Sequence, residues 1–578
     1  MVRNKDSYTV AGYLNMCHKV YNHIKSKKNM QMKKMNSRRS RNRNDASLWD
    51  RRLTRRKALS TGAKVGIAAG LGLVIGAVGG YFGGAASKPE VTITKTVTAP
   101  GTTVTTGAAT VTKTVTETKT VTQTLRETVT ISATPTTVTE LPPGVKKADW
   151  GIYPEYLKGT QITAAVQLID SLIAVKDLLP QLEDETGIKV DFILLPEEEL
   201  HKKVLIELST GTGKYDVVMD DCMFVPEFAE NGWVVPLDQF IEDPNLTSEP
   251  LFNLNDFLAK SIEIGKYKGK LYGLPIYAET TVLIYRKDVF EEHGIKVPDT
   301  MEDLGKACEE LKEVLPSDTY PISLRGFPGA GANVYIWTGF LKAFGADFFD
   351  EDWNPMINSD EGVEATGFYA ELLAKYGPAG SANYHWDDVQ TALQQGKAMM
   401  TIEASDFIGR IEDPKQSLFA GKFGYSLVPS GRAGRFPSIF AFELMINAAS
   451  PKERQEAAWI FIKWATSKKL QLEAAVAHNF SNVVRSSVMN DPKYLEVWGK
   501  YADWMEAHGK SLAEIASIDY RPRIPVWREV GNRIGIAVSD VIAKAQGGAD
   551  PYSEAKKALD AAAKDIRDIM IKAGYLKA

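Results

Sequence analysis

Few residues of this chain have the types and spacing that catalysis requires. Asp387 and Asp388 form an acidic pair of the kind that glycosidases use, and the separation of two such carboxylates decides whether they can act. The run Gly211-Thr-Gly-Lys214 resembles part of a phosphate-binding loop. It lacks the first half of that motif and stands between a predicted helix and a predicted strand, the reverse of the required order. We therefore interpret it as a turn.

Metal and disulfide chemistry are also poorly represented. The seven His are scattered, with no His-x-x-His or His-Glu-x-x-His spacing, so the sequence predicts no metal site and no cofactor. The three Cys are too few and too dispersed for a disulfide framework. Cys222 and Cys308 can pair only if the fold brings them together. These residue types favour a binding protein over an enzyme.

Acidic side chains recur beside apolar runs, an arrangement that suits recognition of a hydroxyl-rich ligand. Asp, Glu, Asn and Arg make charge-assisted hydrogen bonds with hydroxyls, and these bonds are strong in a closed, dry site. Aromatic rings pack on the apolar faces of sugars. The 11 Trp residues suit that role, and they suit core packing equally well.

Strands and helices alternate at the start of the predicted folded region. The hydrophobic pattern predicts strands at 162–166, 188–193 and 215–219, and helices at 173–185 and 197–209. This βαβαβ order indicates a parallel sheet with helices on both faces. Ligands bind beyond the carboxyl ends of such strands. That rule selects four polar residues after the first and third strands: Gln167, Asp170, Asp220 and Asp221.

The segment from Gly273 to Asp288 carries the most specific pattern. It contains Gly-Leu-Pro, then the acid Glu279, then the apolar strand 282–285, then Arg-Lys-Asp. This order resembles the hinge crossover of the extracellular solute-binding proteins of ABC importers, in their sugar-binding, maltose-binding-like branch. Further phrases extend the resemblance from about residue 160 to the C-terminus, among them Gly269-Lys-Leu-Tyr-Gly-Leu-Pro275, Gln395-Gly-Lys-Ala-Met-Met400 and Phe461-Ile-Lys-Trp-Ala-Thr-Ser467.

The resemblance implies an α/β fold with two lobes, the type II periplasmic-binding-protein fold. Each lobe is a sheet flanked by helices, and hinge strands join the lobes. The solute-binding domain is expected at 155–578. Lobe 1 is expected at about 160–280 and 428–480, and lobe 2 at about 284–424 and 481–578.

The resemblance also implies where ligand contacts fall. Glu279 matches the family's acid at the ligand cleft, with a structural hinge carboxylate as the alternative. Phe442 and Glu443 are expected in the loop before the strand 445–447. The family often has an aromatic residue there, so Glu443 departs from its pattern. The other expected contacts follow strands or lie in later loops: Arg325, Tyr384, Trp386, Glu403, Asp406 and Trp527.

The function that the resemblance implies is capture of a carbohydrate or polyol outside the cell. A monomeric protein that is no enzyme would deliver this ligand to the permease subunits of an ABC importer. Two alternatives stay open: a membrane-anchored glycan-active enzyme, and a sensor or adhesin on the same fold. The net charge of −3 gives no global attraction to nucleic acid.

The N-terminal part differs in composition from the rest. Residues 1–64 are crowded with Lys and Arg and predict a cytoplasmic arm. They contain Thr54-Arg-Arg-Lys-Ala-Leu59, which resembles a twin-arginine export signal with Ala58 in place of the usual Phe. Residues 65–87 carry no charge and are long enough for one membrane span of about 20 residues. The basic residues before this segment place the N-terminus inside. Met35 is an alternative start.

Residues 88–145 repeat Val-Thr and Thr-Val-Thr units, with almost no long apolar side chains that could form a core. This composition indicates an exposed stalk rather than strands. A stalk requires an anchor that is kept, so we expect an uncleaved anchor rather than a cleaved signal. The sequence thus predicts a binding domain held on the extracellular side of the cell membrane.

Overall fold

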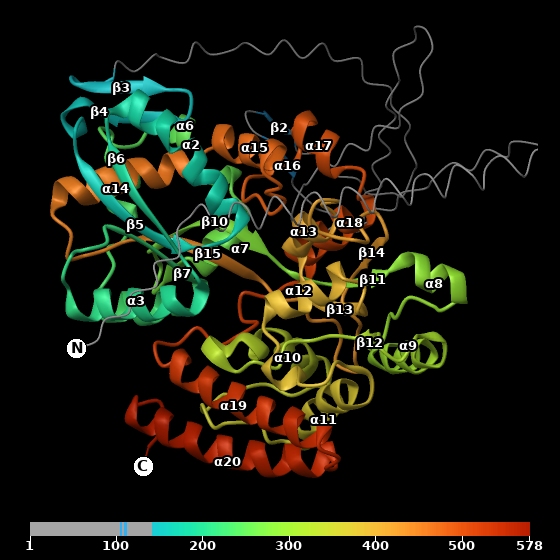
Figure 1. The fold of residues 1–578 in the computed structure, drawn as a ribbon. Coiled ribbons are helices and arrows are strands. Elements are labelled where there is room, and N and C mark those ends of the chain that lie inside the picture. Colours follow the sequence, from blue (N-terminus) through green and yellow to red (C-terminus); the bar gives the residue numbers. More distant parts are fainter. Residues whose placement is uncertain (1–103, 107–108, 112–140, 578) are drawn as a thin grey trace, which may run out of the picture. The chain divides into compact units, whose positions relative to one another are not determined.

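The computed structural model describes residues 104–106, 109–111 and 141–577 (Figure 1). The chain divides into two units, 1–131 and 132–578. The predicted basic arm, the apolar segment and most of the predicted stalk lie outside the described residues. In the part of the chain that the structure describes, no helix is both long enough and apolar enough to cross a membrane.

Two short strands occur within the predicted stalk. β1 (Val104–Thr106) pairs antiparallel with β2 (Ala109–Val111). The sequence predicts no strand here, so the structure departs from that expectation. The physical reason is that Val and Thr, with their β-branched side chains, favour extended backbone.

Lobe 1 is built on a five-stranded sheet with strand order β10-β15-β7-β5-β6. β5 runs parallel to β6 and β7, as the βαβαβ pattern predicts, whereas β15 runs antiparallel to both of its neighbours. The strand bounds are β5 (Gln161–Gln167), β6 (Lys189–Leu195), β7 (Val217–Asp221), β10 (Gly273–Glu279) and β15 (Phe440–Ile446).

Helices pack against this sheet and bury its apolar side chains. Helix α2 ends at Gly187, whose φ of +73° is readily adopted by glycine. Helix α14 contributes the fully buried Trp459 and Trp464 to the core. The helices of lobe 1 are α2 (Asp170–Thr186), α3 (Glu197–Thr210), α4 (Val225–Glu230), α5 (Asp238–Ile241), α6 (Glu249–Phe252), α7 (Ala259–Ile264), α14 (Lys452–Ala465) and α15 (Lys468–Ala477), with β8 (Lys266–Tyr267) and β9 (Lys270–Leu271) forming a small hairpin.

Lobe 2 is built on a four-stranded sheet with strand order β12-β13-β11-β14. The strands are β11 (Thr281–Arg286), β12 (Tyr320–Ile322), β13 (Ala398–Ala404) and β14 (Phe423–Ser426). Helices α10, α11, α19 and α20 pack on one another at the far end of this lobe (Figure 1). The helices are α8 (Lys287–His293), α9 (Met301–Val314), α10 (Ala332–Ala343), α11 (Asp360–Tyr376), α12 (Trp386–Gln394), α13 (Ile408–Ile411), α18 (Ala502–Lys510), α19 (Trp527–Gln546) and α20 (Pro551–Lys572).

The chain passes between the lobes at the predicted hinge. β10 ends at Glu279 and β11 begins at Thr281, so Thr280 alone separates the two sheets. Its hydroxyl donates to the carbonyl of Ser438, which lies on the second crossing of the chain, at 2.7 Å. The two hinge segments are therefore tied together where they pass each other.

The chain passes between the lobes a third time, and this passage comes later than the predicted boundary at residue 481. Helices α16 (Ser486–Met489) and α17 (Pro492–Trp498) contact α15 of lobe 1, whereas the prediction assigns 481–578 to lobe 2. The reason is local packing, because Trp498 is buried and its indole N–H donates to the carbonyl of Ala475 at 3.2 Å. The chain reaches lobe 2 at α18, which contacts β14 and β11.

The folded domain also begins earlier than the predicted boundary at residue 155. The hairpin of β3 (Val145–Ala148) and β4 (Gly151–Pro154) packs on α14. Trp150 is buried beside it. Lys463 of α14, 1% exposed, donates from Nζ to the carbonyl of Ile152 at 2.8 Å and also to the carbonyl of Leu246. A buried lysine thus fastens the start of the domain to lobe 1.

Replacing Lys463 by Met is expected to remove one pH dependence of stability. Burial lowers the pKa of Lys463 to about 7, from an ordinary value of 10.5. Between these values the unfolded state binds a proton that the folded state does not. The free energy of unfolding of the parent, minus that of Lys463→Met, should therefore increase as pH rises from about 7 to about 10. Urea titrations at both ends of this range measure the difference, and a difference that stays constant contradicts the prediction.

Candidate ligand-binding cavity

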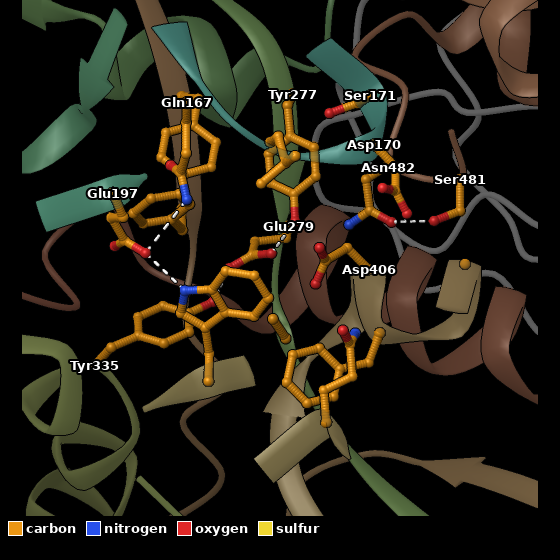
Figure 2. A pocket seen from close by; sticks show the side chains of 18 of the residues that line it. Gln167, Asp170, Ser171, Glu197, Tyr277, Glu279, Tyr335, Asp406, Ser481 and Asn482 are labelled. Atoms are coloured by element: carbon orange, nitrogen blue, oxygen red, sulfur yellow. Dashed lines mark hydrogen bonds between the residues drawn. The ribbon is translucent and has the colours of Figure 1, made fainter. Parts of the chain in front are cut away.

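A cavity lies between the lobes, beside the hinge (Figure 2). It has about 920 Å³ of empty space, part of which is open to solvent. Eight of the residues selected from the sequence line it: Gln167, Asp170, Asp221, Glu279, Arg325, Trp386, Asp406 and Phe442.

Asp220 and Glu403 do not line the cavity, although both were predicted contacts. Each is fully buried behind a residue that does line it. Asp220 accepts a hydrogen bond from the backbone N–H of Asp221 at 2.9 Å. Glu403 binds the guanidinium of Arg325. Because the side chains of a strand alternate between its two faces, adjacent residues of β7 and β13 cannot both point into the cavity.

Phe442 and Glu443 lie within β15, and the prediction that they lie in a loop is wrong. Strand alternation turns Phe442 toward the cavity and Glu443 away from it, against Gly273 and Gly265. Neither carboxyl oxygen of Glu443 has a hydrogen-bond partner in the described part of the chain. Burial raises the pKa of Glu443 well above its ordinary value, and this outweighs the opposing charge of Arg523. The side chain is therefore a neutral, structural carboxyl.

Tyr384 and Trp527 also lie away from the cavity. Trp527 begins α19 and packs edge-to-face on Phe348, with ring centroids 5.1 Å apart. It is a core residue of lobe 2. Tyr384 precedes α12 and packs against the hydrophobic core, while its backbone carbonyl accepts the N–H of Gly326 at 2.9 Å. Sequence alone does not separate these core aromatics from aromatics that line a cavity.

Glu279 and Asp406 lie next to each other in the cavity wall (Figure 2). Glu279 accepts hydrogen bonds from the hydroxyls of Tyr277 and of Tyr335, the latter at 3.0 Å. Burial, and then the charge of Asp406, raise the pKa of Glu279 well above its ordinary value. Burial also raises the pKa of Asp406. Two adjacent carboxyls cannot both ionise at low cost, so the pair favours a state in which one of the two is protonated.

Arg325 supplies the positive charge of this wall. Its guanidinium makes two parallel hydrogen bonds to Glu403, at 2.5 and 2.6 Å. It also lies 5.0 Å from the ring centroid of Tyr335, a cation–π distance. Arg325 is 8% exposed and Glu403 is 0% exposed. The pair is therefore a buried, bidentate ion pair whose guanidinium faces the cavity.

Several cavity residues were missed from the sequence. Arg521 is buried, and its Nε and Nη2 have no hydrogen-bond partner among the described residues. It lies six residues before Trp527, the aromatic that was expected to contact the ligand in this part of the chain. Tyr277 stands two residues before Glu279 on the same strand face, a spacing that could have identified it. Other missed residues, which carry no local signal, include Glu197, Tyr335, Arg410 and Asn482.

Two polar contacts bridge the lobes across the cavity. The indole N–H of Trp386 in lobe 2 donates to Oε2 of Glu197 in lobe 1 at 2.7 Å. Arg410 in lobe 2 binds Asp170 in lobe 1 through two hydrogen bonds of 2.8 and 2.9 Å. These contacts hold the lobes together in this structure, so the cavity residues of both lobes face one another.

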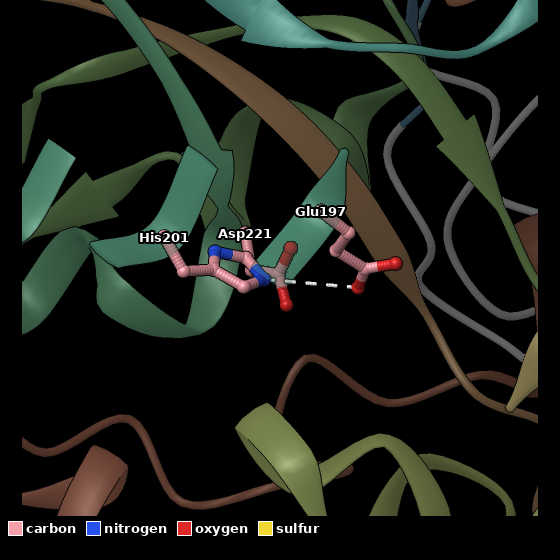
Figure 3. Close-up of side chains that lie close together, drawn as sticks. All are labelled: Glu197, His201 and Asp221. Atoms are coloured by element: carbon pink, nitrogen blue, oxygen red, sulfur yellow. Dashed lines mark ion pairs between the residues drawn. The ribbon is translucent and has the colours of Figure 1, made fainter. Parts of the chain in front are cut away.

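Glu197, His201 and Asp221 gather at one edge of the cavity (Figure 3). Burial raises the pKa of Glu197, but the ion pair with His201, at 3.7 Å, and the charge of His385 outweigh it and bring the pKa to about 2. Burial raises the pKa of Asp221 to about 7. The sequence predicts no metal site because it contains no His–His spacing. In the fold, two residues of one helix, Glu197 and His201 of α3, lie beside Asp221 at the end of strand β7.

The chain matches the profile of the bacterial extracellular solute-binding protein family over residues 168–472. A mannitol-binding protein of Pseudomonas aeruginosa is 28% identical over 52% of this chain and 67% of its own length. An erythritol/L-threitol-binding protein of Mycolicibacterium smegmatis is 28% identical over 54% of this chain and 68% of its own length. A solute-binding protein of an ABC transporter from Agrobacterium radiobacter, solved with ribitol, is 27% identical with a TM-score of 0.63, over 71% of this chain and 99% of that one.

Proposed function

The chain belongs to the bacterial extracellular solute-binding protein family, and we propose that it captures an acyclic polyol in the cavity between its lobes. Members of this family bind ligands rather than convert them, so the chain is a binding protein and not an enzyme. It serves as the extracytoplasmic binding component of an ABC importer, and the permease subunits of that importer are its partners.

The observation that carries this proposal is the set of buried polar atoms in the cavity wall that lack a partner. Within the described residues, these are Oε1 of Gln167, Oγ of Ser171, Oδ1 of Asp221, and Nε and Nη2 of Arg521. Such atoms are costly to bury unpaired. A polyol carries a hydroxyl on every carbon, and each hydroxyl both donates and accepts. Acceptors and donors that face one cavity therefore suit a chain of hydroxyls.

Three of the similar proteins support a polyol, while others are named for maltotriose and arabinooligosaccharide. The names of the three similar proteins refer to mannitol, erythritol or L-threitol, and ribitol, all of which are acyclic. A pyranose ring stacks on an exposed aromatic face. In this cavity the indole N–H of Trp386 is engaged by Glu197 across the lobes, while charged and amide groups supply most of the polar contacts. Aromatic rings also line the cavity, among them Tyr277, Phe440 and Phe480, so the ligands tested must include ring sugars as well as polyols.

A ligand panel tests this function. Mannitol, ribitol and erythritol are compared with maltose, glucose and an amino acid by thermal unfolding and calorimetric titration. A ligand at one hundred times its Kd stabilises the folded state by about 2.7 kcal/mol, so a polyol should raise the unfolding temperature saturably. A shift with maltose alone, or with the amino acid alone, contradicts the polyol assignment.

We also propose that residues 65–87 anchor the monomeric protein in the cell membrane, with the Thr-rich segment 88–145 holding the domain outside. The uncharged segment after a basic arm supports this topology. Membrane fractionation followed by N-terminal sequencing checks it. Recovery of a soluble protein that begins near Ser87 excludes the anchor and leaves the binding function intact.

A further inference from the structure

We propose that Glu197, His201 and Asp221 form a binding site for a divalent transition-metal cation of the zinc class in the cavity wall (Figure 3). One ligand atom of each residue lies within 4.8 Å of the others. Carboxylate oxygen and imidazole nitrogen are ligands that zinc accepts, and sites with three protein ligands leave one position open. All three residues belong to lobe 1, so the site does not depend on lobe closure.

Rigid elements set the spacing of these side chains. Glu197 begins α3 and His201 lies four residues later, so both project from one face of the helix. Asp221 ends β7, against which α3 packs. The helix and the strand thus deliver three ligands to one point at the carboxyl end of the sheet.

His201 is held in the way that metal-binding histidines are held. Its Nδ1 lies 2.5 Å from Oδ1 of Asp220, and such a carboxylate fixes the ring and directs Nε2 toward a metal. His201 is 4% exposed, and Nε2 has no hydrogen-bond partner among the residues described. Oδ1 of Asp221, which is 6% exposed, likewise lacks one. A cation between them would satisfy both atoms.

The distances suit a small cation. Zinc bonds to nitrogen and oxygen of about 2.0–2.2 Å place neighbouring ligands of a tetrahedral site about 3.3–3.6 Å apart. Nε2 of His201 lies 3.7 Å from Oε1 of Glu197. Oε2 of Glu197 is occupied by the donors of Gln167 and Trp386, which leaves Oε1 for the metal. One carboxyl oxygen of Asp221 lies within 4.8 Å of both of the other ligand atoms.

The alternative occupant of Nε2 is a proton. Burial lowers the pKa of His201, but the charge and hydrogen bond of Asp220 outweigh it and raise the pKa well above the ordinary value. The group then acts as an imidazolium between carboxylates. A zinc ion would replace that proton and meet the same negative charges. Direct measurement of metal binding separates the two occupants.

The open coordination position faces the ligand. Glu197 and Asp221 both line the cavity, so a cation held between them is exposed to its contents. A polyol hydroxyl can fill that position, and this part of the inference rests on the proposed function. The metal site itself does not.

Calorimetric titration of the chelator-treated full-length protein with zinc chloride tests the site. The parent should bind one more zinc ion than Asp221→Asn or Glu197→Gln, two variants that preserve side-chain volume. His293→Ala, which removes an exposed histidine at the end of α8, should match the parent. His18 and His23 are common to all variants, so any zinc that they bind cancels in the comparison.

Two further readouts complete the test. Asp220→Asn should weaken zinc binding about 10–100-fold, because carboxylates that orient a ligand affect metal affinity by that factor. Equal zinc stoichiometry in the parent, Asp221→Asn and Glu197→Gln overturns the proposal in favour of the proton. These titrations use zinc alone, so they remain decisive even if no polyol binds.

Discussion

Replacing Arg325 by Ala should lower the free energy of unfolding by about 3–5 kcal/mol, because removing one partner of a buried ion pair leaves the other charge uncompensated. Here that charge is Glu403, which is 0% exposed. The guanidinium also contributes to the cavity wall beside Tyr335. Polyol binding should therefore be lost together with stability. Urea unfolding and calorimetric titration measure the two effects.

Two control variants sharpen this experiment. Arg432→Ala breaks the pair of Arg432 with Glu364, in which both side chains are about half exposed, and exposed pairs contribute about 0–1 kcal/mol. The double variant Arg325→Met with Glu403→Gln removes both buried charges and should recover much of the stability, since apolar replacement of a buried pair is often neutral. A loss in Arg325→Ala no larger than that in Arg432→Ala contradicts the prediction.

Replacing Asp406 by Asn should weaken polyol binding about tenfold to a hundredfold, since hydrogen bonds to charged groups contribute about 1.5–3 kcal/mol. The pKa of Glu279 is raised well above its ordinary value, so we expect Asp406 to carry the negative charge of the pair. Asn retains the shape and loses the charge. Calorimetric titration with the polyol identified by the panel measures the change.

The matched control is Glu279→Gln. The hinge position of Glu279 suggests from the sequence a charged acceptor whose replacement by Gln would weaken binding. The raised pKa of Glu279 alters that expectation, because Gln resembles a protonated carboxyl. Its Kd should therefore change less than about threefold, below the tenfold step that 1.4 kcal/mol represents. If Glu279→Gln weakens binding more than Asp406→Asn does, the charge of the pair lies on Glu279 instead.

Local pattern predicts the elements of lobe 1 well and the cavity only partly. The strands at 162–166, 188–193 and 215–219 correspond to β5, β6 and β7, because apolar runs bounded by turns depend on neighbouring residues alone. The loop expected at Phe442 and Glu443 came from the family resemblance, and the structure instead continues β15 through both residues. The structure accommodates Glu443 as a neutral group against Gly273 and Gly265.

Residues brought in by tertiary packing could not be found in this way. Tyr335 comes from a buried helix and Arg521 from a loop, and no spacing in the sequence relates either of them to Glu279. His201 could not be identified from the sequence for the same reason. Its neighbours are Glu197, one turn earlier on α3, and Asp221, at the end of strand β7. Strand ends indicate where a cavity forms, whereas the remaining wall depends on how the two lobes meet.

The central position of β15 sets the order in which lobe 1 can be completed. β15 separates β7 from β10 in the sheet, yet the chain reaches it only after the strands of lobe 2. Until the ribosome has passed Ile446, β7 and β10 present unpaired edges, and such edges are prone to pair with other chains. Pairing at long sequence separation is also slow to form. The nascent protein therefore passes through an interval in which the sheet of lobe 2 is complete while that of lobe 1 still lacks its central strand, and α19 and α20 of lobe 2 follow later still.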